Sequence, residues 1–579
     1  MIITSHALID IEKCFKVEAG PGAGKTEFLI NHIKNVLHNS KRLDKTRKIA
    51  CITYTNVAAQ TIVSRLGKGA SNRVEVSTIH SFLYKHVVRP YLHFISSEYD
   101  VNLKKVRGHD DFFINRKYVY DWLDGKEFEA LKGKFNRKSL KFIFYEALKE
   151  WLLSIRCTCD NDRVFYICDN KKALQNNKNQ RTRIPNETLL ILSNYLLELK
   201  KIYWKNGKLD HNDILFFSYI LIEKYPFILE ILRAKFPYIY VDEYQDTNPI
   251  QTFILERIRE KETIVGVIGD RAQSIYSFQG AMPTLFDSFH VDANCEFTIE
   301  ENHRSTKKII SLLNAVRSDI MQKGVDSTIE GENIVLVIGD RNDAFRMAYD
   351  CCGGVLQSLS RDNTTANALK KDFEETSMNT KLLNKFEESD SDDYRRQRIW
   401  SFIQAVELSF NNNYKEALKK IEWIFSNENN SRKAAIASLS KLLLYYKDFC
   451  NKMLIDFYHT ICSITGLKLT GFREGNAKKF YDSTPYKSLA ICVDIVDDTS
   501  SHITIHKAKG AEYDNVIVFN DELKSFLLSP NLQTNEEHRI IYVALSRARK
   551  RLFLYLEDLS KEEEKTIKTK YKYIKVIRL

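Results

Sequence analysis

The chain has 579 residues, which is too many for one hydrophobic core and suggests roughly four domain-sized units. Hydrophobic residues make up 44% of it and charged residues 28%, and 87 basic against 75 acidic side chains give a net charge of +12, which permits nucleic acid as a partner without requiring it. No apolar run approaches the roughly 18 residues that cross a bilayer, and the first residues lack the pattern of a secretory signal, so we expect a cytoplasmic protein without membrane contact. The 11 cysteines are scattered, and we expect them to stay reduced.

A glycine-rich loop follows the first clear strand signal. Residues 15–18 are predicted to form a short buried strand, residues 19–26 have the sequence AGPGAGKT, and a helix is expected to begin at about Thr26. Glycines let backbone amides turn inward around phosphates, and the N-terminus of the helix adds a positive dipole. Lys25 is expected to reach the β- and γ-phosphates and Thr26 to hold Mg²⁺; the alternative is a glycine-rich turn without a ligand. The predicted nucleotide-binding residues of this loop are Ala19 (where the general pattern has glycine), Gly20, Pro21, Gly22, Ala23, Gly24, Lys25, Thr26 and Glu27.

Two adjacent carboxylates follow a second apolar run. Residues 238–241 are predicted to form a buried parallel strand beside the P-loop strand, and Asp242 at its carboxyl end is placed to coordinate Mg²⁺ through water. Glu243 can accept a proton from the attacking water. A third strand is predicted over residues 264–268, and the alternative for both carboxylates is that they are ordinary surface acids.

Taken together, these motifs resemble those of the UvrD/Rep/PcrA group of superfamily 1A helicases. Similar motifs follow in the order found in that family, at residues 50–62, 76–83, 241–251, 268–281, 300–306, 505–518 and 536–549. The resemblance implies an α/β fold of two RecA-like parallel-sheet P-loop domains with largely helical insertions. It implies motor domain 1A at 1–88 and 206–305, insertion 1B at 89–205, motor domain 2A at 306–375 and 487–579, and insertion 2B at 376–486. Residues 389–393 (SDSDD) are interpreted as a hinge loop, and we expect no fused nuclease.

The resemblance also implies roles for single residues. Arg304 and Arg547 would reach the γ-phosphate from the 2A side, Gln273 would sense that phosphate, and Glu512 would bind the ribose. Single-stranded nucleic acid would be held by Tyr54, Tyr276 and Phe278, which stack on bases, and by Thr78, His80 and His506, which contact the backbone. Phe278 stands where the family usually has tryptophan and Gln279 where it usually has arginine. The basic run at 171–183 has two open interpretations, a solvated face or a nucleic-acid contact.

Base recognition is the feature in which the chain departs most from that family. It has no glutamine before Gln60, whereas the family reads adenine with a glutamine upstream of the P-loop. His303 stands where an aromatic residue stacks on adenine, and His32 where an arginine contacts the ribose or base. Because discrimination between bases needs paired hydrogen bonds, we expect a loose preference for adenine, unless Asn31 or a residue among 2–12 replaces the glutamine.

Two functions of different classes fit these residues. The leading hypothesis is an ATP- and Mg²⁺-dependent DNA helicase that moves 3′→5′ on single-stranded DNA and at single-strand/duplex junctions, in DNA repair or phage defence. The alternative is a DNA-stimulated ATPase sensor that regulates a separate OLD-type nuclease subunit, since the compact chain with short insertions resembles the GajB subunits of Gabija antiphage systems, which work beside such a nuclease. No motif in the chain separates the two hypotheses, because the nuclease would be a separate protein.

Overall fold

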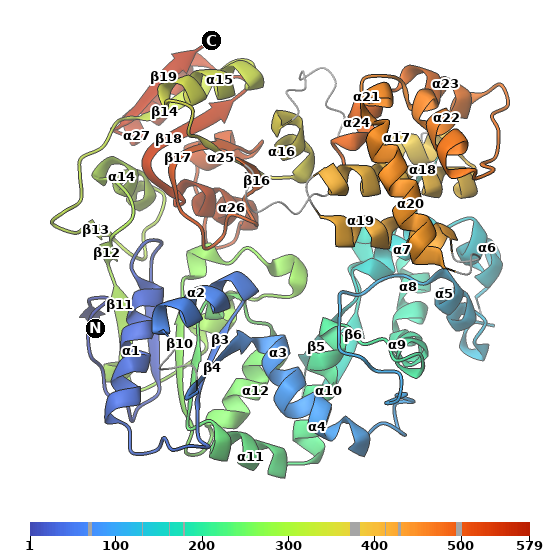
Figure 1. The fold of residues 1–579 in the computed structure, drawn as a ribbon. Helices are drawn as coiled ribbons and strands as arrows, with labels where there is room; N and C mark the ends of the chain where they lie inside the picture. Colours follow the sequence, from blue (N-terminus) through green and yellow to red (C-terminus); the bar gives the residue numbers. More distant parts are fainter. Residues whose placement is uncertain are drawn as a thin grey trace. The chain divides into compact units, whose positions relative to one another are not determined.

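The structure is a computed structural model that describes residues 1–67, 72–129, 131–160, 163–177, 180–370, 382–410, 413–425, 430–493 and 501–579. The chain forms two compact units. The first contains Met1–Arg304, Arg317–Thr328 and Leu532–Arg539, and the second contains Ser305–Val316, Ile329–Asn531 and Ile540–Leu579. Each unit is built on one large parallel sheet with helices around it, which confirms the predicted α/β class (Figure 1).

The sheet of the first unit has seven parallel strands in the order β1-β11-β2-β10-β9-β3-β4. Their bounds are β1 Ile2–Ile3, β2 Phe15–Ala19, β3 Ile49–Thr53, β4 Val74–Thr78, β9 Tyr238–Val241, β10 Ile264–Gly269 and β11 Glu296–Ile299. The three strands predicted from apolar runs are therefore confirmed, each to within one residue. Parallel strands buried on both faces read as continuous apolar runs, and this is why short windows of sequence identified them.

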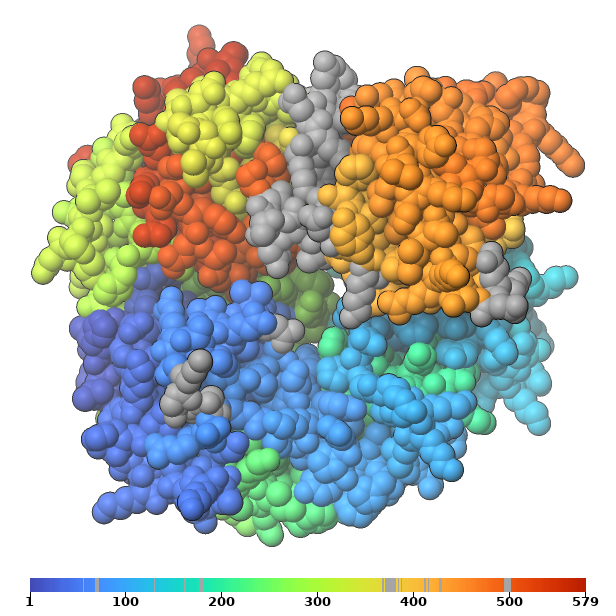
Figure 2. Space-filling model, in the orientation of Figure 1, coloured from blue at the N-terminus to red at the C-terminus, as the bar shows by residue number. Residues whose placement is uncertain are grey.

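Alternate residues of these strands enter two hydrophobic clusters, one on each face of the sheet. On β9, Tyr238 and Tyr240 belong to one cluster, whereas Ile239 and Val241 belong to the other. Helices α1 (Lys25–Asn39) and α2 (Asn56–Leu66) cover the first face; α3 (Ile79–Leu83), α10 (His211–Lys224), α11 (Phe227–Lys235) and α12 (Pro249–Arg259) cover the second. Residues of the blue and cyan segments form most of the surface of this unit on the face drawn in Figure 2.

The predicted insertion 1B packs into the second of these clusters. It contains α4 Arg89–Tyr91, α5 Arg116–Leu123, α6 Arg137–Phe142, α7 Tyr145–Leu153, α8 Asn186–Ser193 and α9 Leu196–Lys205, together with two antiparallel hairpins, β5 Arg156–Asp160 with β6 Arg163–Ile167 and β7 Leu174–Asn177 with β8 Gln180–Arg183. The basic run at 171–183 falls on the second hairpin, and its residues 178–179 lie outside the described residues. The hydrophobic core is continuous from 1B into the helices beside the sheet, because Trp151, Trp204 and Phe217 belong to one cluster.

The second unit has a six-stranded parallel sheet in the order β16-β15-β17-β18-β14-β19. Its strands are β14 Ile334–Ile338, β15 Gln357–Ser360, β16 His502–Thr504, β17 Tyr513–Phe519, β18 Ala548–Leu556 and β19 Ile574–Arg578. Its helices are α14 Lys307–Ala315, α15 Arg341–Cys351, α16 Asn363–Lys370, α25 Leu523–Leu528 and α27 Lys561–Lys570, together with the greater part of α26 Glu536–Leu545. Across the described residues, no helix is both long enough and apolar enough to span a bilayer.

A separate helical cluster of the second unit lies between β15 and β16 in the chain. It is formed by α17 Leu382–Ser389, α18 Asp393–Phe410, α19 Tyr414–Glu422, α20 Ser431–Leu444, α21 Tyr446–Phe449, α22 Leu454–Thr465, α23 Asn476–Ser483 and α24 Tyr486–Ala490. The interpretation of residues 389–393 as a hinge loop is not supported. Asp390 is fully buried, where it accepts hydrogen bonds from Arg395 Nε (2.9 Å) and the Tyr481 hydroxyl (2.9 Å), so this segment is tied to the cluster.

Candidate active site

Three neighbouring strands of the first sheet end where the predicted catalytic residues begin. Strand β10 pairs with β2 on one side and with β9 on the other. Ala19 closes β2, Asp242 follows β9, and Asp270 follows β10. The strand that carries Asp242 was expected beside the P-loop strand, but β10 lies between them. The carboxyl ends of parallel strands are the edge at which such sheets bind ligands, so the three segments define a candidate site.

The loop from Gly20 to Gly24 has the backbone of a phosphate cradle. Gly22 and Gly24 have φ angles of 71° and 81°, a region that L side chains rarely adopt. A Cβ atom at Gly22 would lie 2.7 Å from Arg304 Cβ, and one at Gly24 would lie 2.8 Å from Ser5 Cβ, so these positions have no room for a side chain. The residue at position 19 can be alanine because its side chain is buried in the core at the end of β2.

Helix α1 begins at Lys25, directly after the cradle, and points its free N-terminal amides at the loop. Lys25 Nζ donates to the carbonyl oxygens of Ala19 (3.2 Å) and Gly20 (3.4 Å) and so lies inside the loop. Thr26 and Glu27 occupy the first turn, where Glu27 pairs with Arg65 at 3.8 Å. A loop of inward amides with a lysine ammonium inside it suits a chain of phosphates.

Three residues of the first unit, Asn302, His303 and Gln322, hold this loop from outside. The amides of Asn302 and Gln322 both donate to the carbonyl oxygen of Pro21, at 3.1 and 2.8 Å, and the backbone N–H of His303 donates to Gly22 O at 2.9 Å. Strand β12 (Glu301–Asn302) pairs with β13 (Lys323–Gly324) in the same unit. Arg304 therefore lies against the P-loop as the last residue of its segment of the first unit. The bounds predicted for 1A, 206–305, also include Arg304, and its approach to the γ-phosphate from the 2A side stays a prediction.

The predicted metal and base residues lie at the end of β9. Asp242 is buried, its backbone N–H donates to Ile52 O (2.8 Å), and its carboxylate accepts from the backbone N–H of Glu243 (3.0 Å). Glu243 has a φ angle of 56°, which is rare for a residue with a side chain and costs about 1–3 kcal/mol. Its carboxylate accepts a hydrogen bond of 2.6 Å from Gln245 Nε2. Such strain in a non-glycine residue is typical of functional sites. The residues that could hold a divalent cation are Asp242, through its carboxylate, and Thr26, through its hydroxyl.

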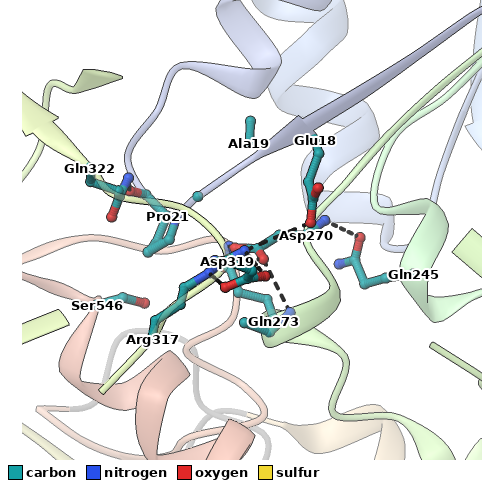
Figure 3. Close-up of polar contacts among 12 residues, drawn as sticks. Glu18, Ala19, Pro21, Gln245, Asp270, Gln273, Arg317, Asp319, Gln322 and Ser546 are labelled. Atoms are coloured by element: carbon teal, nitrogen blue, oxygen red, sulfur yellow. Dashed lines mark hydrogen bonds and ion pairs between the residues drawn. The ribbon is translucent and has the colours of Figure 1, made fainter. Parts of the chain in front are cut away.

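A buried charge network, shown in Figure 3, continues from β9 to β10. Gln245 Oε1 accepts from the backbone N–H of Asp270 (2.9 Å), and Asp270 Oδ2 accepts from Gln273 Nε2 (2.5 Å). The guanidinium of Arg317 pairs with Asp270 at 2.8 Å. Burial and the neighbouring Asp270 raise the pKa of Glu18, the residue before Ala19, to about 7, although Arg317 opposes this shift. Sequence reasoning found Gln273 but missed Glu18 and Arg317, because neither lies in a motif.

The three aromatic residues predicted to stack on bases are unequally exposed. Tyr54 and Tyr276 stack on each other with ring centroids 4.5 Å apart and planes inclined by 24°, and Tyr276 is buried. The hydroxyl of Tyr54 is hydrogen-bonded to Gln279. Phe278 is 64% exposed, which makes it the ring best placed to meet a base.

We expect Phe278→Ala to weaken activation by single-stranded DNA more than basal hydrolysis. Loss of one stacked base costs about 1–3 kcal/mol, so half-maximal activation should need roughly 5- to 150-fold more DNA. Titration of ATPase activity with single-stranded DNA measures this. Phe142→Ala, which changes an equally exposed ring on α6, is the matched control. Equal loss of basal and stimulated rates would argue that Phe278 serves only the fold. Tyr276→Ala is a less clean test, since it also removes a buried partner of Tyr54.

Thr78 and His80 lie at the start of α3. The Thr78 hydroxyl caps this helix by accepting from Ser81 N (3.3 Å) and donates to the Ser81 hydroxyl (3.0 Å). The ring of His80 lies 5.0 Å from that of His211, and burial together with His211 and His109 lowers the pKa of His80 well below its usual range. His80 is therefore neutral at physiological pH and can contact nucleic acid only as an uncharged donor or acceptor.

The remaining predicted residues belong to the second unit. Arg547 is 2% exposed, and its guanidinium donates to Val543 O (3.0 Å), Ala511 O (3.2 Å) and the Ser546 hydroxyl (2.9 Å). His506 lies in a turn after β16, and Glu512 is exposed just before β17. Arg547 is thus hydrogen-bonded to the carbonyl of the residue that precedes Glu512.

One residue predicted to lie at the base or ribose, His32, has a different place in the structure. His32 cannot contact a ligand, because it is 1% exposed and its ring packs among Phe15, Phe28 and Tyr240. Burial lowers the pKa of His32 to about 4, so it stays neutral in the core.

A small polar group lies near the first turn of α1. Asn31 Nδ2 lies 3.4 Å from Ser5 O and 3.2 Å from His6 Nδ1, and His303 Nε2 lies 3.2 Å from a Glu301 carboxylate oxygen. Ser5 and His303 are both neighbours of Gly24. Asn31 and the N-terminal segment, the sequence-based candidates for replacing the missing glutamine, therefore contact each other.

Comparison with known proteins gives matches to two protein-family models. The UvrD/REP helicase N-terminal domain matches residues 4–294, and the UvrD-like helicase C-terminal domain matches residues 494–558. The chain is 24% identical to the probable DNA helicase II homolog of Mycoplasma genitalium over 93% of this chain and 82% of that protein. It is 25% identical to the ATP-dependent DNA helicase PcrA of Staphylococcus aureus over 95% and 82%, and 27% identical to the ATP-dependent DNA helicase Rep of Buchnera aphidicola over 61% and 48%. The two matched segments include Lys25, Asp242 and Arg547.

Proposed function

Because this chain belongs to the UvrD/Rep helicase family, we propose that it is an ATP-dependent DNA helicase that uses hydrolysis to move along single-stranded DNA. The observation that carries the proposal is the P-loop cradle, with Lys25 inside it, at the same sheet edge as Asp242 and Glu243. ATP and Mg²⁺ suit these residues, since the glycine positions of the loop have no room for side chains and a buried carboxylate follows β9.

Each residue of the site has a proposed part in hydrolysis. Lys25 and the loop amides bind the phosphates, while Thr26 and Asp242 would hold Mg²⁺, which offsets phosphate charge when it is bound. Glu243 takes the proton of the attacking water. Gln273 is proposed to sense the γ-phosphate, and Arg304 and Arg547 to neutralise the charge that develops on it. Glu512 is proposed to bind the ribose.

The finer parts of the proposal rest on the sequence motifs. They are 3′→5′ polarity, action at single-strand/duplex junctions, a cytoplasmic location, a role in repair or phage defence, and the division into 1A, 1B, 2A and 2B. The separate hydrophobic clusters of the second unit support the distinction between 2A and 2B. Contacts from Tyr54, Thr78, His80, Phe278 and His506 to the strand belong to the same proposal.

The test is unwinding of duplexes that carry either a 3′ or a 5′ single-stranded tail. We expect unwinding from the 3′ tail that requires ATP and Mg²⁺. DNA-stimulated hydrolysis without unwinding of either substrate would contradict the helicase proposal and favour the ATPase sensor. Restoration of activity by a co-purifying nuclease would then identify the partner.

We further expect the preference for ATP over GTP to be weak. His32 is in the core and cannot contact a base, so of the residues considered for base recognition His303 and the Asn31 group remain near the loop. GTP should therefore support turnover within about tenfold of ATP, a difference of roughly 1.4 kcal/mol. Competition of the two nucleotides during steady-state turnover measures this. A preference for ATP of about a hundredfold or more would contradict it and make Asn31→Ala the variant to examine next.

A further inference from the structure

One arginine of the first unit lies in no predicted motif and yet contacts the catalytic network. Arg317 directly follows a segment of the second unit and begins the stretch Arg317–Thr328 of the first. Its side chain is 1% exposed. Arginine is rarely buried to this extent unless its charge is paired, so its partners indicate what it does.

Two carboxylates pair with the guanidinium from different directions (Figure 3). Arg317 Nε and Nη2 donate to the two carboxylate oxygens of Asp319, at 2.6 and 3.0 Å, and Nη1 lies 2.8 Å from Asp270 Oδ1. A third carboxylate, that of Glu18, lies 3.9 Å from Nη2. The Asp319 side chain is 44% exposed, whereas that of Asp270 is fully buried. Asp319 thus orients the guanidinium with a two-point bond, and the guanidinium supplies the counter-charge that a buried Asp270 requires.

Asp270 is connected by hydrogen bonds to two proposed catalytic groups, to Gln273 directly and to Glu243 through Gln245. Its other oxygen, Oδ2, accepts the hydrogen bond from Gln273 Nε2, and its backbone N–H donates to Gln245 Oε1. Gln245 Nε2 in turn donates to the Glu243 carboxylate. Arg317 is thus one contact from Asp270, two from Gln273 and three from Glu243. Because Oδ1 and Oδ2 belong to one rigid carboxylate, Arg317, together with the backbone N–H of Ala272 that donates to Oδ1 (3.1 Å), holds in place the oxygen that accepts from Gln273.

The same short segment also contacts the P-loop. Gln322 donates to Pro21 O, and a Cβ atom at Gly20 would lie 2.6 Å from Gln322 Nε2. The phosphate cradle is therefore held by Gln322, while the residues that act on the γ-phosphate are held through Arg317. Changing Arg317 should accordingly affect turnover rather than nucleotide binding.

We propose that Arg317, held in place by Asp319, is a positioning residue of the ATPase site that fixes Gln273 and Glu243 through Asp270. The proposal rests on the proposed function and assigns to the described segment Arg317–Thr328 a part in positioning catalytic groups that no motif assigns to it. Arg317 itself transfers no proton and touches no substrate in this scheme.

Arg317→Lys tests the proposal, because lysine keeps the charge but cannot make the forked contacts with both carboxylates at once. In the full-length variant we expect kcat for DNA-stimulated hydrolysis to fall about tenfold or more, since small misplacements of catalytic groups have large effects on rate. Affinity for a non-hydrolysable ATP analogue should stay within about threefold of the wild type. Arg395→Lys is the matched control: it alters a buried arginine paired with Asp390 in the second unit and should leave kcat unchanged.

A double-mutant cycle separates positioning from a merely structural ion pair. If Arg317 acts through Asp270 on Gln273 as well as on Glu243, then the loss of kcat in Arg317→Lys combined with Gln273→Ala should be smaller than the product of the two single losses. Independent, multiplicative losses would overturn the proposal. If Arg317→Lys does not fold, Asp319→Asn tests the same contact, because it changes a half-exposed partner of Arg317. We expect its kcat to be about threefold lower than that of the wild type, and an unchanged kcat would overturn the proposal. Absence of ATPase activity in the wild type would instead contradict the proposed function.

Discussion

Glu243→Gln is expected to lower DNA-stimulated ATP turnover by about 10²- to 10⁴-fold while nucleotide binding persists. An amide has nearly the shape of the carboxylate but cannot accept a proton from water. The glutamine can still occupy the strained backbone position and remain near Gln245, so the phosphate cradle is left intact. Phosphate release under steady-state conditions and equilibrium binding of a fluorescent nucleotide measure the two effects separately.

Glu223→Gln is the matched control, because it changes a half-exposed glutamate that pairs with Arg257 on the surface of the same unit. That variant should retain wild-type turnover. Near-wild-type hydrolysis by Glu243→Gln with DNA present would show that another group takes the proton. Loss of binding together with turnover would mean that Glu243 serves the local fold, which its φ angle of 56° makes a real alternative.

Lys25→Ala is expected to abolish turnover through loss of binding. The ammonium lies within 3.4 Å of the Ala19 and Gly20 carbonyls, at the centre of the cradle, and removing it leaves the loop itself with backbone amides alone to offset the phosphate charge. We expect nucleotide affinity to fall at least about tenfold and hydrolysis to fall by about 10²-fold or more. The same pair of measurements distinguishes this variant from Glu243→Gln.

Lys34→Ala controls for loss of a positive charge from α1, since Lys34 is exposed on the same helix. It should bind and hydrolyse nucleotide like the wild type. Undiminished nucleotide affinity in Lys25→Ala would show that the loop amides and helix N-terminus suffice to hold the phosphates, and would restrict Lys25 to the chemical step.

Local patterns were enough for the elements that carry the site. The apolar runs that became β2, β9 and β10 and the helix after AGPGAGKT were predicted to within a residue, because strand burial and the glycine loop are short-range signals. The family and the α/β class followed from the same short motifs. Proton-accepting and metal-binding chemistry could be assigned to Glu243 and Asp242 because the two are the first residues after one buried strand, although these roles remain predictions.

Only the tertiary structure decided which of these residues lie together and what holds them. It placed β10 between β2 and β9, put His32 in the core, attached Arg304 to the P-loop through Asn302, and brought Arg317 to Asp270. These contacts join residues far apart in the chain, so no spacing or periodicity in a short window records them. A buried arginine and an exposed one have the same local sequence signal. The difference arises because the fold removes water from Arg317 and pairs it with Asp270, which follows β10, and with Asp319 of its own segment.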